Sequence, residues 1–121
     1  MAGTVTVSEE TFGTVKKLTW SWTSDASGDA SGTTSTNAYS GAISRLVTVP
    51  DGVDAPTVNY DVVVNDEDST DVLMGGGQNR SDTATEQVLA SSLGFVANDK
   101  LALVVSGAGN AKKGTVYIYV R

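Results

Sequence analysis

The sequence predicts an all-β protein, a single-domain, jelly-roll-like β-sandwich with about seven to eight short antiparallel strands. Thr, Ser, Val and Gly dominate the composition, whereas Leu and Glu are sparse, and this balance favours strands and turns over helices. Several segments alternate apolar with polar residues, as half-buried strands do. Turn-forming Gly, Asp and Asn separate these segments, and no repeat period is present that would indicate a solenoid or propeller.

The length of the chain predicts a single folding unit. Its 121 residues correspond to one ordinary domain, and no shift in composition divides residues 1–121 into two parts. A domain of this size buries about two-thirds of the surface of its unfolded chain. A hydrophobic core of that extent needs no disulfide or metal ion to hold it together.

The first element is a short alternating segment at the N-terminus. Thr4, Val5, Thr6 and Val7 have the period of a strand. Residues 1–8 therefore form either the first strand of the protein's own sheet or an arm that adds a strand to a neighbouring protein through backbone hydrogen bonds. Both interpretations stay open on sequence alone, and the four residues are candidates for a protein interface.

The clearest strand covers residues 15–23. Leu18, Trp20 and Trp22 fall on one face of it, and polar residues occupy the alternate positions. Two indoles in phase can fill a core or form a platform on which a sugar ring stacks. The polar alternates favour the core.

Residues 24–38 contain almost only Ser, Thr, Asp, Gly and Ala, so they predict a long flexible loop. Loops beyond about 12 to 15 residues are usually mobile or functional. A strand follows over residues 41–49, and Pro50-Asp51-Gly52 supplies a turn after it.

The middle of the chain predicts a hairpin. Residues 57–65 alternate as a strand, Asp66-Glu67-Asp68 forms the turn, and residues 71–74 resume the strand. Residues 75–80, which begin with three glycines, form a loop.

Residues 81–93 are ambiguous between two structures. Thr83 and Glu86 have the spacing of a capping box, which would start a helix, whereas Thr-rich alternation predicts a strand. We favour the strand. Asn98-Asp99 then predicts a turn before a strand over residues 100–105.

The last predicted strand, over residues 115–121, is apolar on both faces. Val116, Ile118 and Val120 form one face, and Tyr117 and Tyr119 form the other. A second apolar face is covered by another strand, by another subunit or by nothing. Tyr117 and Tyr119 are therefore interface candidates, and a homo-oligomer is expected.

Missing residue types and net charge exclude several functions. The chain has no Cys and no His, which removes thiolate and imidazole metal ligands, Cys nucleophiles and the common imidazole general base. A net charge of −6 opposes binding to nucleic acid. No long apolar run or signal peptide is present, so no membrane partner is expected. We predict no enzymatic activity and no cofactor.

One acidic cluster in the sequence is a candidate for a cation site. Asp66, Asp68 and Asp71 are the kind of ligand that Ca²⁺ prefers. The spacing fails to match an EF-hand, because Asp71 stands where Gly is required and Gly77 stands where Glu is required. The cluster is a weak candidate for a metal site beside the simpler interpretation of a solvated hairpin, and the prediction is no metal.

Several segments resemble the small, acidic, cysteine-free β-proteins encoded among the structural genes of tailed bacteriophages. They are residues 13–22, 49–52, 79–81, 96–101 and 114–121. The resemblance implies a capsid decoration (cement) protein that binds the outer shell and stabilises it. The implied partner is the major capsid protein or another virion protein, and the implied location is the capsid exterior after assembly in the host cytoplasm. A tail or head-tail connector component remains an alternative.

A further alternative is a carbohydrate- or host-receptor-binding β-sandwich module. Exposed Trp or Tyr side chains and the segment 24–37 would then form its site.

Overall fold

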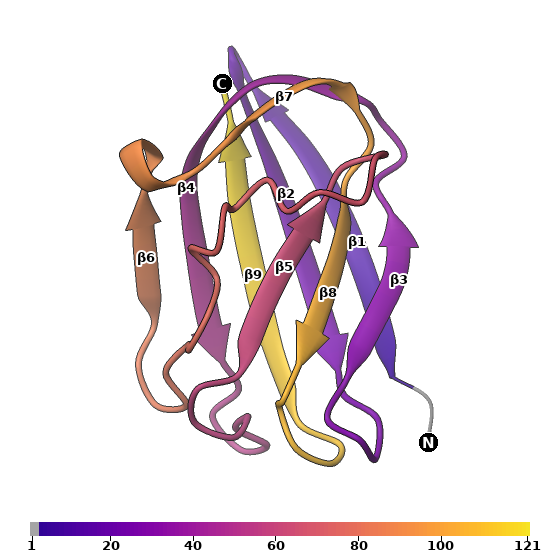
Figure 1. The fold of residues 1–121 in the computed structure, drawn as a ribbon, viewed down its shortest axis with the longest axis vertical. Coiled ribbons are helices and arrows are strands. Elements are labelled where there is room, and N and C mark those ends of the chain that lie inside the picture. Colours follow the sequence, from indigo (N-terminus) through magenta and orange to yellow (C-terminus); the bar gives the residue numbers. More distant parts are fainter. Residues whose placement is uncertain (1–2) are drawn as a thin grey trace.

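The computed structural model describes residues 3–121 as a sandwich of two antiparallel sheets (Figure 1). The large sheet has the order β1-β2-β9-β4-β6, with β7 also paired to β4, and the small sheet has the order β3-β8-β5. The strands are β1 (Thr4–Phe12), β2 (Val15–Thr23), β3 (Ala30–Thr34), β4 (Tyr39–Pro50), β5 (Asp61–Asn65), β6 (Glu86–Leu89), β7 (Phe95–Asp99), β8 (Ala102–Ser106) and β9 (Lys113–Val120). The predicted fold class is confirmed, with nine strands in the described residues.

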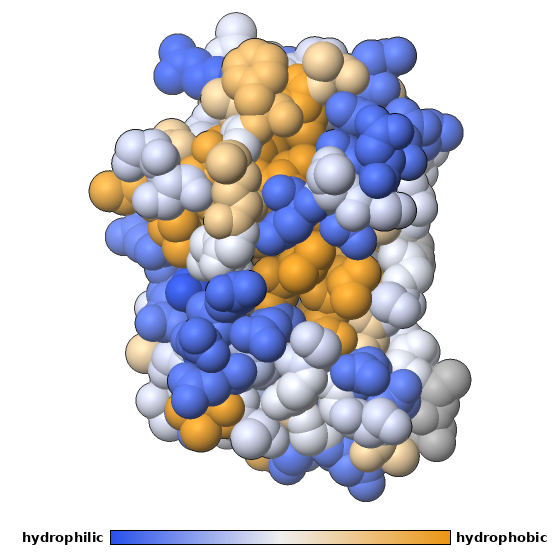
Figure 2. Space-filling view, viewed as in Figure 1, coloured by the Kyte–Doolittle hydropathy of each residue, from blue (hydrophilic) through white to orange (hydrophobic). Residues whose placement is uncertain are grey.

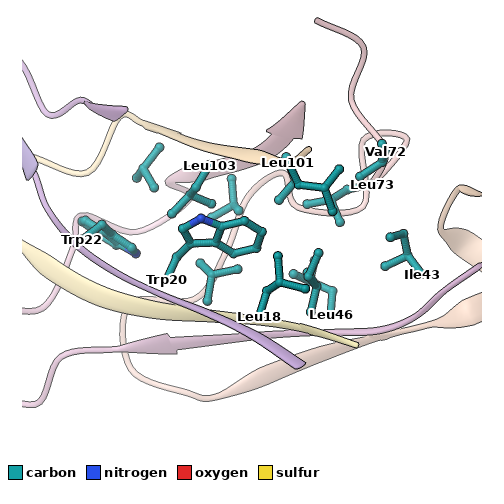
Figure 3. Packing of buried hydrophobic residues seen from close by; sticks show 14 of the residues in the cluster. Leu18, Trp20, Trp22, Ile43, Leu46, Val72, Leu73, Leu101 and Leu103 are labelled. Atoms are coloured by element: carbon teal, nitrogen blue, oxygen red, sulfur yellow. The ribbon is translucent and has the colours of Figure 1, made fainter. Parts of the chain in front are cut away.

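The core lies between the two sheets and contains the predicted apolar face of β2. Leu18 and Trp20 point from the large sheet toward Leu101 and Leu103 on the other side of the core (Figure 3). Trp20 is 0% exposed and Trp22 is 2% exposed. The core interpretation of the two indoles is confirmed, and the sugar platform that they could have formed is excluded.

A β-bulge in β4 explains an irregular apolar pattern in its sequence. Ile43 pairs with Val120 and Arg45 pairs with Tyr119, so Ser44 is an extra residue in β4. The bulge restores the alternation, which lets Ile43 and Leu46 both point into the core although three positions separate them. Arg45 points out of the same strand.

The expectation of one long loop over residues 24–38 is wrong in part, because β3 lies within it. Ala30 pairs with Val105 and Gly32 pairs with Leu103 of β8. Small side chains suffice here because β8 supplies the bulk of the core at this position. The pairing with β8 therefore specifies this strand, and its own sequence shows no alternation of large apolar residues.

The predicted strand over residues 71–74 is also wrong. Val72 and Leu73 are buried, but they lie in consecutive turns. The Asp71 carboxylate accepts the backbone N–H of Leu73 at 2.9 Å and of Gly75 at 3.0 Å, which holds this turn closed. These apolar residues reach the core without forming a strand. The segment makes a single β-bridge, between Asp71 and Asn65.

Residues 81–93 contain the favoured strand, as β6, followed by one 3₁₀ turn at Ala90–Ser92. The Glu86 carboxylate accepts the backbone N–H of Ser81 at 2.7 Å, and no helix starts at Thr83. The turn predicted at Asn98-Asp99 is wrong, because both residues belong to β7. Asn98 has a φ of 54°, a left-handed backbone conformation that is common in turns but that here occurs within the strand.

No helix within residues 3–121 is long and apolar enough to cross a membrane.

Candidate interaction surface

The outer face of the large sheet collects the two predicted tyrosines and several exposed apolar residues. Residues paired directly across antiparallel strands point to the same side of a sheet. Three rows of such partners cross this face: Glu10, Lys17, Tyr119, Arg45 and Leu89; Ser8, Thr19, Tyr117, Val47 and Gln87; and Thr6, Ser21, Thr115 and Val49. We call this surface the tyrosine face.

Two apolar pairs extend the tyrosine face at the end where β9 finishes. Phe12 pairs with Val15, and Ala42 pairs with Phe95. Ala42 and Arg121 exchange backbone hydrogen bonds of 3.1 and 3.0 Å, which places Arg121 beside the Ala42–Phe95 pair. The face is therefore continuous from β1 to β7.

Both tyrosine rings lie under cationic side chains. The Nζ of Lys17 is 4.8 Å from the ring centroid of Tyr117 and 5.9 Å from that of Tyr119. The guanidinium carbon of Arg45 is 5.6 Å from the ring centroid of Tyr119. Such stacking is worth about 0.5–1 kcal/mol at exposed sites and fixes where the charges sit. The two tyrosines are half-buried, and Val47, which pairs with Tyr117 from β4, is buried.

Exposed apolar side chains are concentrated on the tyrosine face. Six large hydrophobic residues are exposed in the described chain: Phe12, Val53, Val58, Met74, Leu89 and Phe95. Three of them, Phe12 at 57%, Leu89 at 68% and Phe95 at 72%, lie on this one face. Single exposed apolar residues are normal, but a gathering on one face makes that face a candidate interaction surface.

The opposite side of the molecule also carries apolar residues. Figure 2 views that side, over the small sheet, and shows apolar residues at the upper end and in the centre, with hydrophilic residues beside and below them. Val63 pairs with Val104 on this outer side, and both are half-buried. This area lacks the stacked aromatic and cationic groups that characterise the tyrosine face.

The other predicted interface residues divide between the two faces of β1. Thr4 to Val7 pair in register with Trp20 to Thr23 of β2, so they form the first strand of the sheet, and the arm interpretation is not what the structure gives. Val5 and Val7 pack in the core, whereas Thr4 and Thr6 point outward. Residues 1 and 2 of the predicted arm lie outside the described residues.

Two of the three acidic residues proposed as a weak cation site, Asp66 and Asp71, accept hydrogen bonds from backbone N–H groups of their own turns. Asp66 accepts the N–H groups of Asp68 at 2.9 Å and Thr70 at 3.0 Å. The Thr70 hydroxyl, followed by these N–H groups, lowers the pKa of the Asp66 carboxyl below its ordinary value. Within residues 3–121, no group of three or more acidic side chains is arranged to hold a metal ion. This cluster closes a turn.

A carboxylate that sequence reasoning missed is Glu9, on the inner side of β1. Its oxygens accept the N–H groups of Thr36 at 2.8 Å and Asn37 at 3.0 Å and the hydroxyl of Tyr39 at 2.7 Å. Burial raises the pKa of Glu9, but the hydrogen bonds from Tyr39, Asn37 and Thr36 outweigh it, and the net direction is downward. Burial and the bond to Glu9 raise the pKa of Tyr39 to about 12.

The Glu9 cluster ties the edge strand β1 to the connection between β3 and β4. No local pattern indicates it, because Glu9 and Tyr39 are 30 residues apart. The carboxylate has donors on both oxygens, so it acts as a structural clamp.

The sequence matches no protein-family model and no curated protein. Among solved structures, the chain is similar to the crystal structure of FlhE, with a TM-score of 0.40 and 11% identity over 98% of this chain and 96% of that one. It is also similar to a low-affinity xylan-binding module, CBM86, from Roseburia intestinalis, with a TM-score of 0.41 and 9% identity over 99% of this chain and 89% of that one.

A third similar structure concerns carbohydrate-binding modules of the β-sandwich superfamily. Its TM-score is 0.34 and its identity 13%, and the match covers all of this chain and 55% of that one. At these identities the three likenesses concern the β-sandwich fold alone.

Proposed function

We propose that this protein is a non-enzymatic structural protein that docks on another protein through the tyrosine face. In its specific form, the proposal is a capsid decoration protein of a tailed bacteriophage, bound to the outside of the shell. The observation that carries the docking role is the gathering of Tyr117, Tyr119, Arg45 and exposed apolar residues on one sheet face. The virion address rests on the sequence resemblance.

The stacked cations favour a protein partner over a sugar. A sugar ring binds an aromatic side chain by lying on an open ring face, but Lys17 and Arg45 already lie over the rings of Tyr117 and Tyr119. Tyrosine, other aromatics and Arg are the residue types enriched in the energetic centres of protein interfaces. The sugar-binding alternative has also lost the two tryptophans, which are buried.

The chemistry of the polar groups supports a role without catalysis. The chain has no imidazole and no thiol. Three carboxyl groups have a pKa below the ordinary value because they accept nearby hydrogen bonds: Glu9 and Asp66 on both oxygens, and Asp51 from the backbone N–H groups of Val53 and Asp54. A general base needs an oxygen free to accept a substrate proton.

Co-sedimentation of the purified protein with undecorated tailed-phage shells tests this function. We expect saturable binding at a fixed ratio of copies to major capsid protein. Replacing both Tyr117 and Tyr119 with Ser should weaken binding by about tenfold or more. Replacing Val53 and Val58, which are exposed but outside the tyrosine face, with Ser is the matched control and should leave binding unchanged.

Three other outcomes would redirect the proposal. Binding to purified tails and not to shells would move the protein to the tail or the connector. Retention in a polysaccharide gel without binding to either particle would favour the sugar-binding alternative. Binding to shells that survives the Tyr117 and Tyr119 substitutions would show that the docking surface lies elsewhere.

A further inference from the structure

We infer that the partner of the tyrosine face is an acidic protein surface, whose carboxylates meet Arg45 and Lys17 while its apolar groups meet the exposed side chains around them. This inference rests on the proposed docking role and adds the chemistry of the partner. It follows from the charge distribution, from the unused donors of Arg45 and from the cost of burying unpaired cations.

The tyrosine face carries positive side chains, although the whole chain has a net negative charge. The protein carries 14 acidic and 8 basic side chains. In the row that crosses the centre of the face, Lys17 and Arg45 stand with one acidic residue, Glu10. The two ion pairs found within residues 3–121, Arg80–Glu86 and Lys113–Asp54, include neither of these two cations. An acidic protein therefore presents a strip with one excess positive charge on one sheet face.

Arg45 is held in position but keeps donors to spare. Its Nε donates to Gln87 Oε1 at 2.9 Å, and its guanidinium lies over the Tyr119 ring. Its terminal N–H groups have no partner among the described residues. A guanidinium that is fixed in this way offers the paired donors that match the two oxygens of a carboxylate.

Desolvation decides what kind of partner can cover these groups. An apolar partner would bury Lys17 and Arg45 without compensation, and burying an unpaired charge is strongly unfavourable. A partner that supplies carboxylates avoids this cost and also steers its own approach. The exposed apolar residues on the same face, Leu89 beside Arg45 in particular, still gain from burial.

The same charges argue against other occupants. A two-fold contact between two tyrosine faces would bring Lys17 and Arg45 of one copy close to those of the other, which repels. A nucleic acid or an acidic membrane extends well beyond this face and would meet the rest of a chain with net charge −6. A compact acidic patch on a protein fits the small positive strip.

NMR titration of the whole ¹⁵N-labelled chain tests the inference without knowledge of the natural partner. The probe is a short peptide rich in Glu and Leu, and the matched peptide has Gln in place of Glu. We expect the acidic peptide to shift amide signals of Lys17, Arg45, Tyr117 and Tyr119, and the Gln peptide to shift them little. The effect should weaken steeply with added salt.

Charge-removing variants provide the control on location. Replacing Lys17 and Arg45 together with Gln should raise the dissociation constant of the acidic peptide about tenfold. Replacing Lys100 and Lys112 with Gln removes the same charge elsewhere and should change it less than about twofold. Equal effects of the two double variants, or equal binding of the two peptides, would overturn the inference.

The remaining outcomes identify a different occupant. Signals of the tyrosine face that shift with protein concentration in the absence of peptide would show that a second copy binds there. Signals that shift with oligogalacturonate and not with the acidic peptide would show an acidic sugar. If the acidic peptide binds as expected but phage shells do not bind, the virion role fails while the acidic partner stands.

Discussion

The strand β9 carries aromatic or large apolar residues on both of its faces, and the two faces of the large sheet have different environments. On the inner face, Trp20 lies opposite Val116 in a core that the small sheet covers. On the outer face, Thr19 lies opposite Tyr117, and cations lie over the ring. The same alternation therefore supplies a core on one side and the proposed binding surface on the other.

The difference between the two faces lies in what covers them. Trp20 is fully buried by atoms of the same chain, so its contribution belongs to folding. The rings of Tyr117 and Tyr119 remain half-exposed, so most of their contribution is still available for a partner. Stability measurements on the two faces should separate these roles.

The largest effect is expected on the inner face. Replacing Trp20 with Ala should lower the free energy of unfolding by about 3–5 kcal/mol, because it removes a fully buried indole and leaves a cavity. Replacing Tyr119 with Ala should cost less than about 1 kcal/mol. Urea denaturation followed by circular dichroism measures both. Similar costs for the two variants would mean that the outer face is as well packed as the core.

Alternation in the sequence predicted which residues share a face, but not which face is covered. The inner face of β2 was predictable from Leu18, Trp20, Trp22 and their polar alternates. Whether Tyr117 and Tyr119 were buried depended on the position of the small sheet, which is a tertiary property. The sequence predicted the two tyrosines of the candidate surface. It did not predict the cations over them or the exposed apolar residues around them.

The missed elements have a common physical cause. β3 consists of small residues whose pairing is specified by β8, and Val72 and Leu73 are buried in turns held by Asp71. Local patterns cannot reveal a strand that its partner specifies, nor a turn that reaches the core. The Glu9 clamp was invisible for the same reason, because its donors lie far away in the sequence.

A second, smaller loss of stability is expected from a change at Glu9, a polar residue on the inner face of the large sheet. Replacing Glu9 with Gln should destabilise the protein by about 1–2 kcal/mol at neutral pH, because its charged hydrogen bonds to Thr36, Asn37 and Tyr39 become weaker. The pKa of Glu9 is lower in the folded protein than its ordinary value of 4.5. Its stabilising effect is therefore complete above that pH and is lost as the pH falls through the folded-state pKa.

Urea unfolding of the wild type and the Glu9→Gln variant at neutral and acidic pH measures this dependence. The difference in unfolding free energy between the two proteins should shrink at low pH. Replacing Glu10, on the outer face of the same strand, with Gln is the matched control. A difference that stays constant with pH would contradict the clamp.

A third effect, opposite in sign, is expected at Tyr60 in the core. Its hydroxyl is buried without a hydrogen-bond partner among the described residues, and burial raises its pKa to about 12. Replacing Tyr60 with Phe keeps the ring against Trp22, at 5.6 Å between centroids, and removes the unsatisfied group. Stability should stay unchanged or rise by up to about 1 kcal/mol. A loss larger than that would show that the hydroxyl binds an internal water or the nearby Thr48.

The smallest effect is expected on the outer face, and it decides between the two kinds of partner. Lys17→Gln, Tyr117→Leu and the double variant form a cycle that isolates the interaction of the ammonium with the ring. Urea unfolding should give a coupling of about 0.5 kcal/mol, as is typical of an exposed cation over an aromatic ring. A coupling near zero would mean that Lys17 leaves the ring face open in solution. An open ring would remove the physical reason to prefer a protein partner over a sugar, so this small number carries more weight for function than the large loss at Trp20.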